Sequence, residues 1–186
     1  MERFEETLPL NLKRVNFIFK NEEIMSECVK NHKAFILFGE NYGPFEKGQK
    51  YKLKFFIALP FIQKEILKPI SDEKCDNVDV QRYAISERDN EKLTNQSKPY
   101  FLNRIKEFKS VMEYEVENNQ KPKVDLDRYN SYSSNVIDSR LLKLLRLSKA
   151  ELSLDDEKRL TLSEKILYKE LYTVIKVWRD FFLFSL

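Results

Sequence analysis

Few residues of this sequence could do chemistry, and their spacing fits none of the common reaction centres. The chain has one histidine, His32, which cannot by itself complete a histidine-rich metal site. No Cys-x-x-Cys or His-Glu-x-x-His motif occurs. A serine or cysteine nucleophile would need His32 as its base, and no residue is evident that would orient the imidazole. We therefore interpret His32 as an ordinary surface or strand-edge residue.

The three glycines of the chain, Gly39, Gly43 and Gly48, fall within ten residues and mark a region of tight turns. Gly43 and Gly48 have the separation found in phosphate-binding loops. Such a loop requires a lysine after its last glycine and leads into a helix, whereas Gln49 and a strand-like run follow here. We therefore predict no nucleotide site at this loop.

Two acidic pairs, Asp125/Asp127 and Asp155-Asp156, could hold a divalent ion in principle. Adjacent acids in an exposed turn are more often solvated, or they cap the next helix. The sequence therefore predicts no catalytic residue, no cofactor and no metal, and we expect the protein not to be an enzyme. A small enzyme of another type would need a concave site, of which the sequence gives no sign.

The elements that position these residues change character near residue 57. Runs 33–38 and 50–56 flank the glycines, and in the second run apolar residues alternate with lysines, as is typical of a strand. Run 14–19 is interpreted as another short strand. Residues 1–57 are therefore predicted to form a small β-rich domain, which would be marginally stable by itself.

From residue 58 onward, the apolar residues follow the period of a helix. Pro60 is placed to open a helix that Pro69 ends, and the polar stretch 71–97 is predicted to be broken helix and loop. Pro99 opens a stronger helix with an apolar stripe, and 118–122 ends it.

Two further helices are predicted in the last third of the chain. One centres on 136–147, where leucines cover more than one narrow stripe. After a turn at 153–159, Thr161 and Glu164 have the spacing of a capping box for a last helix over 162–182.

The predicted fold class is therefore α+β and mainly α. The small β-rich domain of residues 1–57 comes first, and an α-helical bundle domain of residues 58–186 follows. The change of periodicity leads us to expect that the helical domain carries assembly and that the β portion acts as a separable adaptor.

The composition is that of a soluble intracellular protein. The 33 basic residues nearly balance the 30 acidic ones, for a net charge of +3, so tight autonomous binding to duplex DNA is not indicated. Cys28 and Cys75 are expected to be free thiols, because the charged start Met1–Thr7 is no secretory signal. No run approaches the ~20 apolar residues that a membrane span requires.

The strongest functional signal is excess apolar surface on the last two predicted helices. One interpretation is a buried central helix in a monomeric core, and the other is that a partner subunit covers the extra faces. Trp178 is expected at the junction between the protein's own core and that partner. The interface candidates are Leu141, Leu144, Leu145, Tyr168, Tyr172, Trp178, Phe181, Phe182 and Phe184.

Three segments resemble the GINS family of replication proteins. Within 38–53, Gly43-Pro44-Phe45 matches a family Gly-Pro-Phe turn that precedes a glycine and a basic-apolar strand. Residues 138–147 resemble the arginine- and leucine-rich helix of the family, and 168–179 resemble its last helix with a Trp-Arg pair. The family often has Pro-Leu-Trp where this chain has Lys-Phe-Phe at 54–56.

The resemblance implies a GINS subunit of the class whose small β domain comes first, similar to archaeal subunits related to the second and third Psf subunits of eukaryotes. It implies a non-catalytic scaffold that activates the MCM helicase together with a RecJ-like, Cdc-type protein. It also implies a two-plus-two tetramer with a related subunit of the helical-domain-first class, and DNA contact that is weak or indirect.

The same resemblance implies that Tyr42, Pro44 and Phe45 dock the small domain. The compartment would be the cytoplasm in an archaeon and the nucleus in a eukaryote.

The main alternative function is a single-stranded nucleic-acid-binding module, because lysines interleave with Tyr51, Phe55 and Phe56 and could frame a platform on which bases stack. Strong salt-dependent binding by the isolated chain would favour that alternative.

Overall fold

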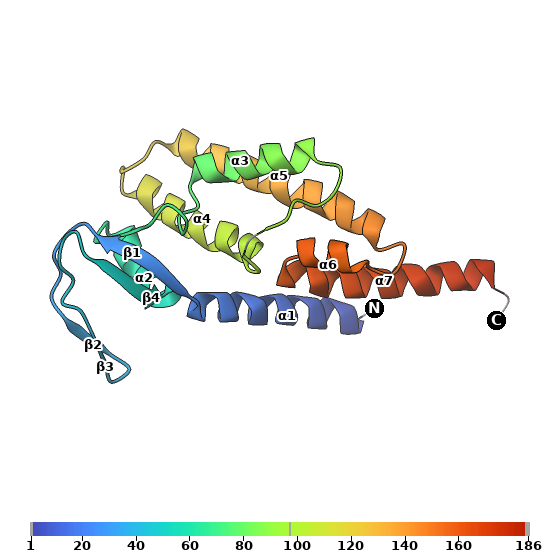
Figure 1. Ribbon diagram of the computed structural model, residues 1–186, viewed down its shortest axis with the longest axis horizontal. Helices are drawn as coiled ribbons and strands as arrows, with labels where there is room; N and C mark the ends of the chain where they lie inside the picture. The colour runs from blue at the N-terminus through green and yellow to red at the C-terminus, as the bar shows by residue number, and fades with distance from the viewer. Residues whose placement is uncertain (1, 97, 185–186) are drawn as a thin grey trace.

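The computed structural model describes residues 2–96 and 98–184, which form an α+β fold that is mainly helical (Figure 1). The first half contains helix α1 (Glu2–Asn21), strands β1 (Glu23–Cys28), β2 (Phe35–Leu37), β3 (Glu40–Tyr42) and β4 (Lys50–Lys54), helix α2 (Phe55–Gln63) and strand β5 (Leu67–Pro69). The second half contains helices α3 (Asn77–Asp89), α4 (Phe101–Glu117), α5 (Lys123–Leu147), α6 (Leu154–Arg159) and α7 (Leu162–Leu183). The predicted fold class is confirmed.

Strands β4, β1 and β5 form an antiparallel sheet in that order. Along β1 buried residues alternate with residues that are exposed or half-buried, so one face of the sheet packs on the helices and the other meets solvent. On the solvent face, Glu23 lies opposite Lys54, and Glu27 lies between Lys50 and Lys68. Opposite charges in such cross-strand positions stabilise the pairing of the strands.

A single core cluster joins the sheet to the helices. The ring of Phe19 in α1 lies 4.9 Å from that of Phe55 in α2, which in turn lies 5.6 Å from that of Phe108 in α4. Tyr129 of α5 is fully buried in the same cluster and donates a hydrogen bond of 2.7 Å to the carbonyl of Ile105. Both predicted domains therefore share one core.

The expected domain boundary at residue 57 falls inside α2, and β5 pairs with β1 although it lies beyond that boundary. Removing residues 1–56 would take away α1, two strands of the sheet and part of the shared core. The β portion is thus physically continuous with the helical bundle, and substitutions rather than deletions are needed to examine its role.

The prediction of a strand at 14–19 is wrong, because these residues belong to α1. Val15 and Phe19 are buried while Phe17 is 70% exposed. A strand would place all three on one face, whereas a helix brings residues four apart onto the same side. Asn16 also faces the bundle, where its amide donates a 2.7 Å hydrogen bond to Glu107 of α4. Apolar residues at alternate positions were compatible with either period, and packing against α4 selects the helix.

Several element boundaries also differ from the prediction. Helix α2 begins at Phe55, directly after β4, so Pro60 lies inside it rather than in its first turn. Strands β1 and β5 were missed, and the stretch 71–97 contains the regular helix α3. A further short helix, α6, occupies the predicted turn at 153–159.

The end of α4 and the last helix agree with the sequence prediction. The Thr161 hydroxyl accepts from the Glu164 amide at 3.3 Å, and the Glu164 carboxylate accepts from the Thr161 amide at 2.8 Å. This reciprocal capping box starts α7, as predicted.

The helical assignment of α1 can be tested by two substitutions two residues apart. We expect Phe19→Ala to lower the free energy of unfolding by about 3–5 kcal/mol, because it opens a cavity between α1, α2 and α4. Phe17→Ala should change it by no more than about 0.5 kcal/mol, since that ring faces solvent. Urea unfolding of both variants measures this difference. Similarly large losses of unfolding free energy for both would contradict the helix and favour a strand at 14–19.

Candidate protein–protein interface

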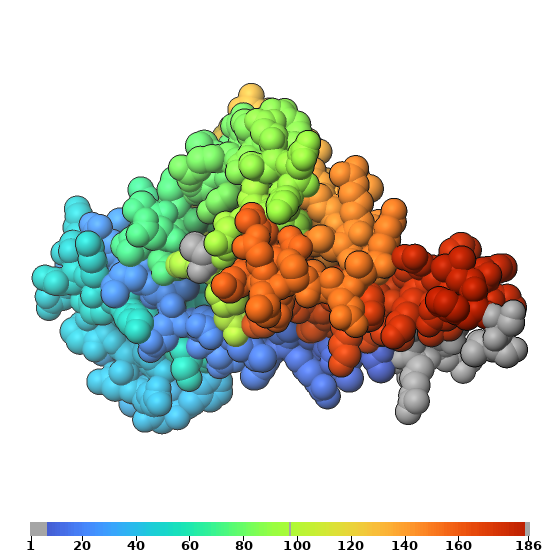
Figure 2. All heavy atoms as spheres, turned by 45° about the vertical axis from the view of Figure 1, so that its right-hand side comes forward, coloured from blue at the N-terminus to red at the C-terminus, as the bar shows by residue number. Residues whose placement is uncertain are grey.

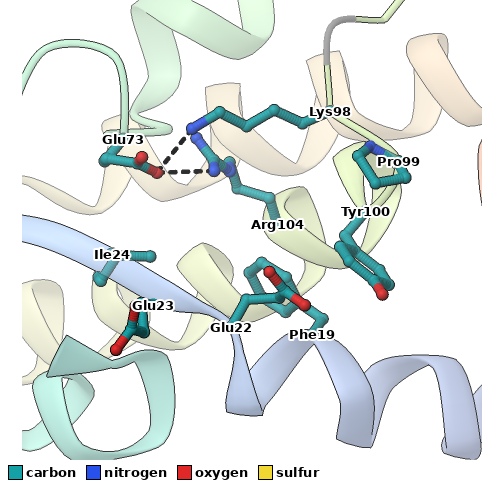
Figure 3. A pocket seen from close by; sticks show the side chains of 9 residues that line it. All are labelled: Phe19, Glu22, Glu23, Ile24, Glu73, Lys98, Pro99, Tyr100 and Arg104. Carbon is teal, nitrogen blue, oxygen red and sulfur yellow. Dashed lines mark hydrogen bonds and ion pairs between the residues drawn. The ribbon is translucent and has the colours of Figure 1, made fainter. Parts of the chain in front are cut away.

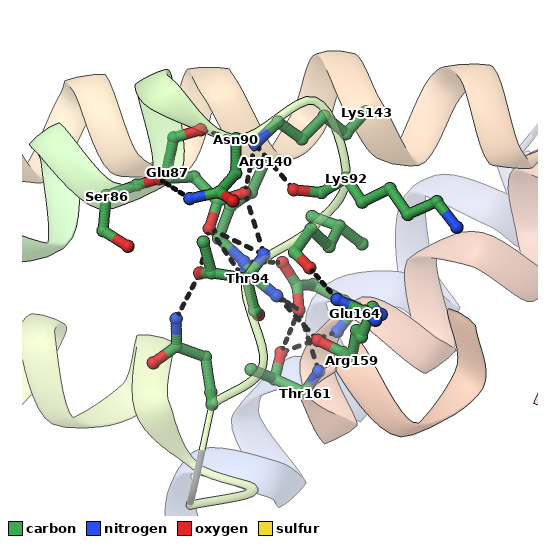
Figure 4. A network of polar contacts seen from close by, with 12 residues as sticks. Ser86, Glu87, Asn90, Lys92, Thr94, Arg140, Lys143, Arg159, Thr161 and Glu164 are labelled. Atoms are coloured by element: carbon green, nitrogen blue, oxygen red, sulfur yellow. Dashed lines mark hydrogen bonds and ion pairs between the residues drawn. The ribbon is translucent and has the colours of Figure 1, made fainter. Parts of the chain in front are cut away.

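A buried ion cluster holds α7 against α3 and α5 (Figure 4). Its centre is Arg140 of α5, which is 1% exposed. The guanidinium donates to both carboxylate oxygens of Glu164, at 2.6 Å from Nε and 2.9 Å from Nη2. Its Nη1 donates to Oε2 of Glu87, at the end of α3, at 2.9 Å. Such bidentate, charge-assisted hydrogen bonds are strong and fix the geometry of both partners.

Two carbonyl groups complete the hydrogen bonding of Arg140. Nη1 also donates to the Thr94 carbonyl at 3.2 Å, and Nη2 to the Arg159 carbonyl at 2.9 Å. Five acceptors therefore match the five N–H donors that a guanidinium carries. A buried charge is tolerated when it is paired and its hydrogen bonds are complete, and this side chain meets both conditions.

The second carboxylate, Glu87, is also tied down on several sides. Lys143 Nζ donates to its Oε1 at 2.6 Å, and the Thr94 hydroxyl donates to its Oε2. Burial by itself would raise the pKa of Glu87, but the hydrogen bonds from Lys143 and Thr94 and the charge of Arg140 hold that pKa below its ordinary value. Glu87 is thereby kept ionised in the interior.

The ion cluster fixes the first half of α7 on the bundle. Leu167 and Leu171 pack against buried Leu144 of α5, and the Tyr168 hydroxyl donates to the Ala150 carbonyl at 2.8 Å. The Ser163 hydroxyl donates to Oδ1 of Asn103 in α4 at 3.0 Å. The direction of α7 is therefore set by its anchored first half.

The second half of α7 extends beyond the rest of the molecule (Figure 1), and its end projects freely in the space-filling view (Figure 2). Its aromatic side chains lie close together. The ring centroids of Trp178 and Phe182 are 5.0 Å apart, and those of Phe181 and Phe182 are also 5.0 Å apart. We call this segment, 174–184, the α7 tail. The exposed apolar residues of the tail are Val174, Val177, Trp178, Phe181, Phe182, Leu183 and Phe184.

The area of this surface is large for a protein that works alone. The four aromatic side chains of the α7 tail are 64% to 68% exposed. At ~150–250 Å² per aromatic side chain, they leave on the order of 500 Å² open to water. The largest apolar patch of a typical monomer covers only ~300–600 Å², and here three aliphatic side chains add to the aromatic area. The α7 tail therefore has the character of a surface that another protein covers.

A second apolar stripe runs along α5 toward the same region. Ile137, Leu141 and Leu145 recur at four-residue spacing and are 37% to 48% exposed. Where the end of α5 meets α7 there is a hollow of about 250 Å³, lined in part by Lys149 and Tyr172. Leu145 of the stripe lies four residues before Lys149, so we expect one partner surface to reach both the α5 stripe and the α7 tail.

The structure separates the interface candidates into two groups. Leu141, Leu145 and the phenylalanines of the α7 tail are exposed, while Tyr168 and Tyr172 are half-buried and stack on each other at 5.8 Å. Leu144 is only 1% exposed and belongs to the chain's own core, so it is not available to a partner.

The expectation for Trp178 needs correction. Its side chain is 64% exposed and contacts Phe182 of the same helix, so it takes no part in the core of this chain. The bundle does not reach far enough along α7 to cover the side chain of Trp178. Only the partner half of the expectation remains as a prediction.

The small-domain docking candidates are also divided. Tyr42 is half-buried and Pro44 is exposed, whereas Phe45 is 1% exposed and packs in the main core. The ion cluster around Arg140 was not predicted from the sequence, and Val174, Val177 and Leu183, although part of the predicted apolar helix, were not among the interface candidates. Arg140 could have been noticed, because it lies four residues from both Val136 and Leu144 on the buried face of α5.

Neither the hollow beside α1 nor the buried thiol of Cys75 offers a catalytic arrangement. One hollow of about 240 Å³ is lined by residues of α1, β1 and α4 (Figure 3). In it Lys98 and Arg104 both contact Oε2 of Glu73 at 2.8 Å, so each cation is paired with this carboxylate. Burial raises the pKa of the Cys75 thiol to about 12, which makes it a poor nucleophile.

Metal-binding groups and membrane-spanning helices are both absent from residues 2–96 and 98–184. These residues contain no group of three or more His, Cys, Asp or Glu side chains placed to hold a metal ion. None of their helices is long and apolar enough to cross a membrane.

The aromatic platform considered for single-stranded nucleic acid is not open. Phe55 is fully buried. The Tyr51 hydroxyl donates to the Pro44 carbonyl at 3.2 Å and accepts from the Glu46 amide at 2.8 Å. Phe45 packs edge-on against the Tyr51 ring, with centroids 4.8 Å apart, and Phe56 is half-buried, so none of the three rings is fully exposed for bases to stack on.

Comparison of the sequence with protein-family models and with curated proteins finds no match in either case.

The Arg140 cluster predicts a large and specific stability effect. Arg140→Ala should lower the free energy of unfolding by about 3–5 kcal/mol, because it leaves Glu164 buried without a cation and removes one of the two cations that pair with Glu87. Arg146→Ala, on the exposed side of the same helix, should change it by no more than about 0.5 kcal/mol. Denaturant titrations of both variants measure the difference, and equal losses would mean that the cluster does not hold α7.

The depressed pKa of Glu87 predicts a pH dependence of stability. The unfolded chain binds a proton on Glu87 at a higher pH than the folded chain does, so this stabilisation is complete above about pH 4.5 and is lost as the pH falls further. Stability should fall as the pH drops below about 4.5, and the fall should be shallower in Glu87→Gln. Thermal melts across that range test this, and identical slopes for the two proteins would refute the assignment.

Proposed function

We propose that the protein is a non-catalytic subunit of a GINS replication complex and that it assembles through the α7 tail and the α5 stripe. The observation that carries this proposal is an aromatic helix end held out in solvent by an anchored first half. The order of the Gly-Pro-Phe turn, the arginine- and leucine-rich helix and the Trp-Arg helix supports the choice of family.

The proposed partner at the α7 tail is a related subunit of the helical-domain-first class, in a two-plus-two tetramer. A standard protein interface covers ~800 Å² on each side, which the tail and the stripe together can supply. Aromatic side chains are enriched among the residues that dominate binding energy, and the tail carries four of them.

The proposed role is to hold the MCM helicase and a RecJ-like protein together, with little direct contact to DNA. The outer face of the sheet supports the second part. Its lysines are opposed by Glu23 and Glu27, and Lys52 Nζ lies 2.7 Å from Oε2 of Glu23. Phosphate binding needs clustered cations that can replace counterions, whereas on this face two glutamates are interleaved with the lysines.

The α7 tail can be tested in the assembled complex. The chain co-expressed with a related subunit should give a two-plus-two complex by native mass spectrometry. Trp178→Ala with Phe181→Ala should weaken that association about tenfold or more, because both rings are truncated at the interface. The melting temperature of the isolated chain should hardly change, since both side chains are exposed in it.

Val78→Ala provides the matched control, because Val78 is 61% exposed on α3, away from the tail. It should assemble as the parent does. A double variant that assembles as tightly as the parent would contradict the proposed interface, and a parent chain that forms no complex with such a subunit would contradict the proposed function.

A further inference from the structure

A hollow of about 560 Å³ opens between the edge strand β5 and the second half of α4. It has more than twice the volume of the hollow beside α1 or of the hollow where α5 meets α7. Ligand pockets in proteins span ~300–1,000 Å³, so this hollow is large enough for a small molecule. We call it the β5 cleft. Its lining residues belong to neither the α7 tail nor the α5 stripe, so it is separate from the surface proposed for assembly.

The floor of the β5 cleft is apolar and belongs to the main core. Its side chains are only 1% to 7% exposed although they line the cleft, so the space above them is narrow. The floor residues are Ile62, Leu67, Cys75, Phe108, Val111 and Met112. Burial raises the pKa of the Cys75 thiol to about 12, so the floor carries no charge at neutral pH. A narrow apolar cleft has room for a methylene chain but not for a helix, which is ~10–12 Å across.

The rim of the β5 cleft is charged, with four lysines against three carboxylates. Each carboxylate lies within 3.1 Å of a rim lysine, in the pairs Glu65–Lys30, Asp76–Lys74 and Glu115–Lys121. The fourth lysine is Lys68 of β5, and no carboxylate in the part of the chain that the structure describes pairs with it. The surplus charge of the rim is therefore one positive charge, on β5.

A second cation lies close to the floor. Lys121 Nζ lies 3.7 Å from Sδ of Met112 and 2.8 Å from Oε2 of Glu115. An ammonium has three N–H donors and a thioether is a weak acceptor, so Lys121 can still donate to an anion. Asp76, in contrast, already accepts from the amides of Val78 and Asp79. The charges of the rim therefore suit an anionic group and leave no free carboxylate for a cation.

We propose that the β5 cleft binds a single-chain amphiphile with a carboxylate head group, with its methylene chain on the apolar floor and its head at the rim beside Lys68 and Lys121. The chain favours binding in proportion to the apolar area that it removes from water. The head group receives charge-assisted hydrogen bonds from the two ammonium groups. Such a site is independent of the proposed function, since no partner subunit takes part in it.

Decanoate is the probe, titrated below its micelle concentration into the full chain with isotope-labelled methionine methyl groups. Met112 lies on the floor of the cleft, whereas Met25 of β1 does not line it. Decanoate should therefore shift the NMR resonance of Met112, leave that of Met25 unchanged and give a Kd from the titration. Hexanoate should bind on the order of a hundredfold more weakly, because it lacks four methylenes.

Two variants test the rim and the floor separately. Lys68→Glu reverses the surplus charge and should weaken decanoate binding about fivefold or more. Lys50→Glu is the matched control and should bind as the parent does, because Lys50 also lies beside Glu27 on the same face of the sheet but does not line the cleft. Val111→Phe places a ring in the cleft and should weaken binding about tenfold, since the ring occupies space that the chain needs. Thermal melts establish that each variant is folded.

The head group is tested with decan-1-ol and decylammonium, which carry the same chain. Both should bind about fivefold more weakly than decanoate, or weaker still. Decan-1-ol that binds as tightly as decanoate, or decylammonium that binds more tightly, would overturn the assignment of an anionic ligand. A Met112 resonance that decanoate does not shift, or equal losses of binding for Lys68→Glu and Lys50→Glu, would overturn the site itself.

Discussion

The structure depends on the ion cluster around Arg140. Burial of a guanidinium costs several kcal/mol by itself, and this is offset only where every donor and the charge are matched. Arg140 meets that condition by drawing on the end of α3, the segment after it, the end of α6 and the start of α7. Two separate stretches of the chain, 87–94 and 159–164, are thereby fixed around one side chain of α5. Apolar packing would favour the association of these stretches with α5. The bidentate contact between Arg140 and Glu164 also sets the angle between α5 and α7.

The angle matters because it determines where the α7 tail goes. Glu164 both caps α7 and binds Arg140, so the start of the helix is fixed at its first turn. A helix rises ~1.5 Å per residue, and the exposed rings therefore lie ~20–30 Å from this anchor, well beyond the bundle. At the other end, the β2–β3 hairpin is connected to the same core through Phe35 and Phe61. Two exposed apolar surfaces are thus held at opposite ends of the molecule.

Features that depend on neighbouring residues were predictable from the sequence, whereas those that depend on distant contacts were not. The capping box at Thr161 and Glu164, and the alternation in 50–56, depend on neighbours within four residues and were predictable. The strand assigned to 14–19 failed because its alternation fits two periods, and contact with α4, some 90 positions away, decides between them. Strand β5 has only three residues, and its pairing with β1 is not visible in its own sequence.

The candidate site was predictable in composition but not in exposure. Its aromatic residues were evident from the sequence. However, Leu144, an interface candidate, is buried in the chain's own core, and Trp178, expected at the edge of that core, lies outside it. A periodic stripe does not show where the bundle stops covering a helix, because that depends on the lengths of the neighbouring helices. The partners of Arg140 lie 24 and 53 positions away, so its role required the folded structure.

The central claim is that a partner subunit covers the α7 tail. Hydrogen–deuterium exchange of the chain, alone and in complex with a related subunit, measures this most directly. The account predicts that amides of 174–183 exchange quickly in the isolated chain and become strongly protected in the complex, while those of the hairpin change little. Exchange in 174–183 that is unchanged on formation of a stable complex would contradict the account and place the interface elsewhere.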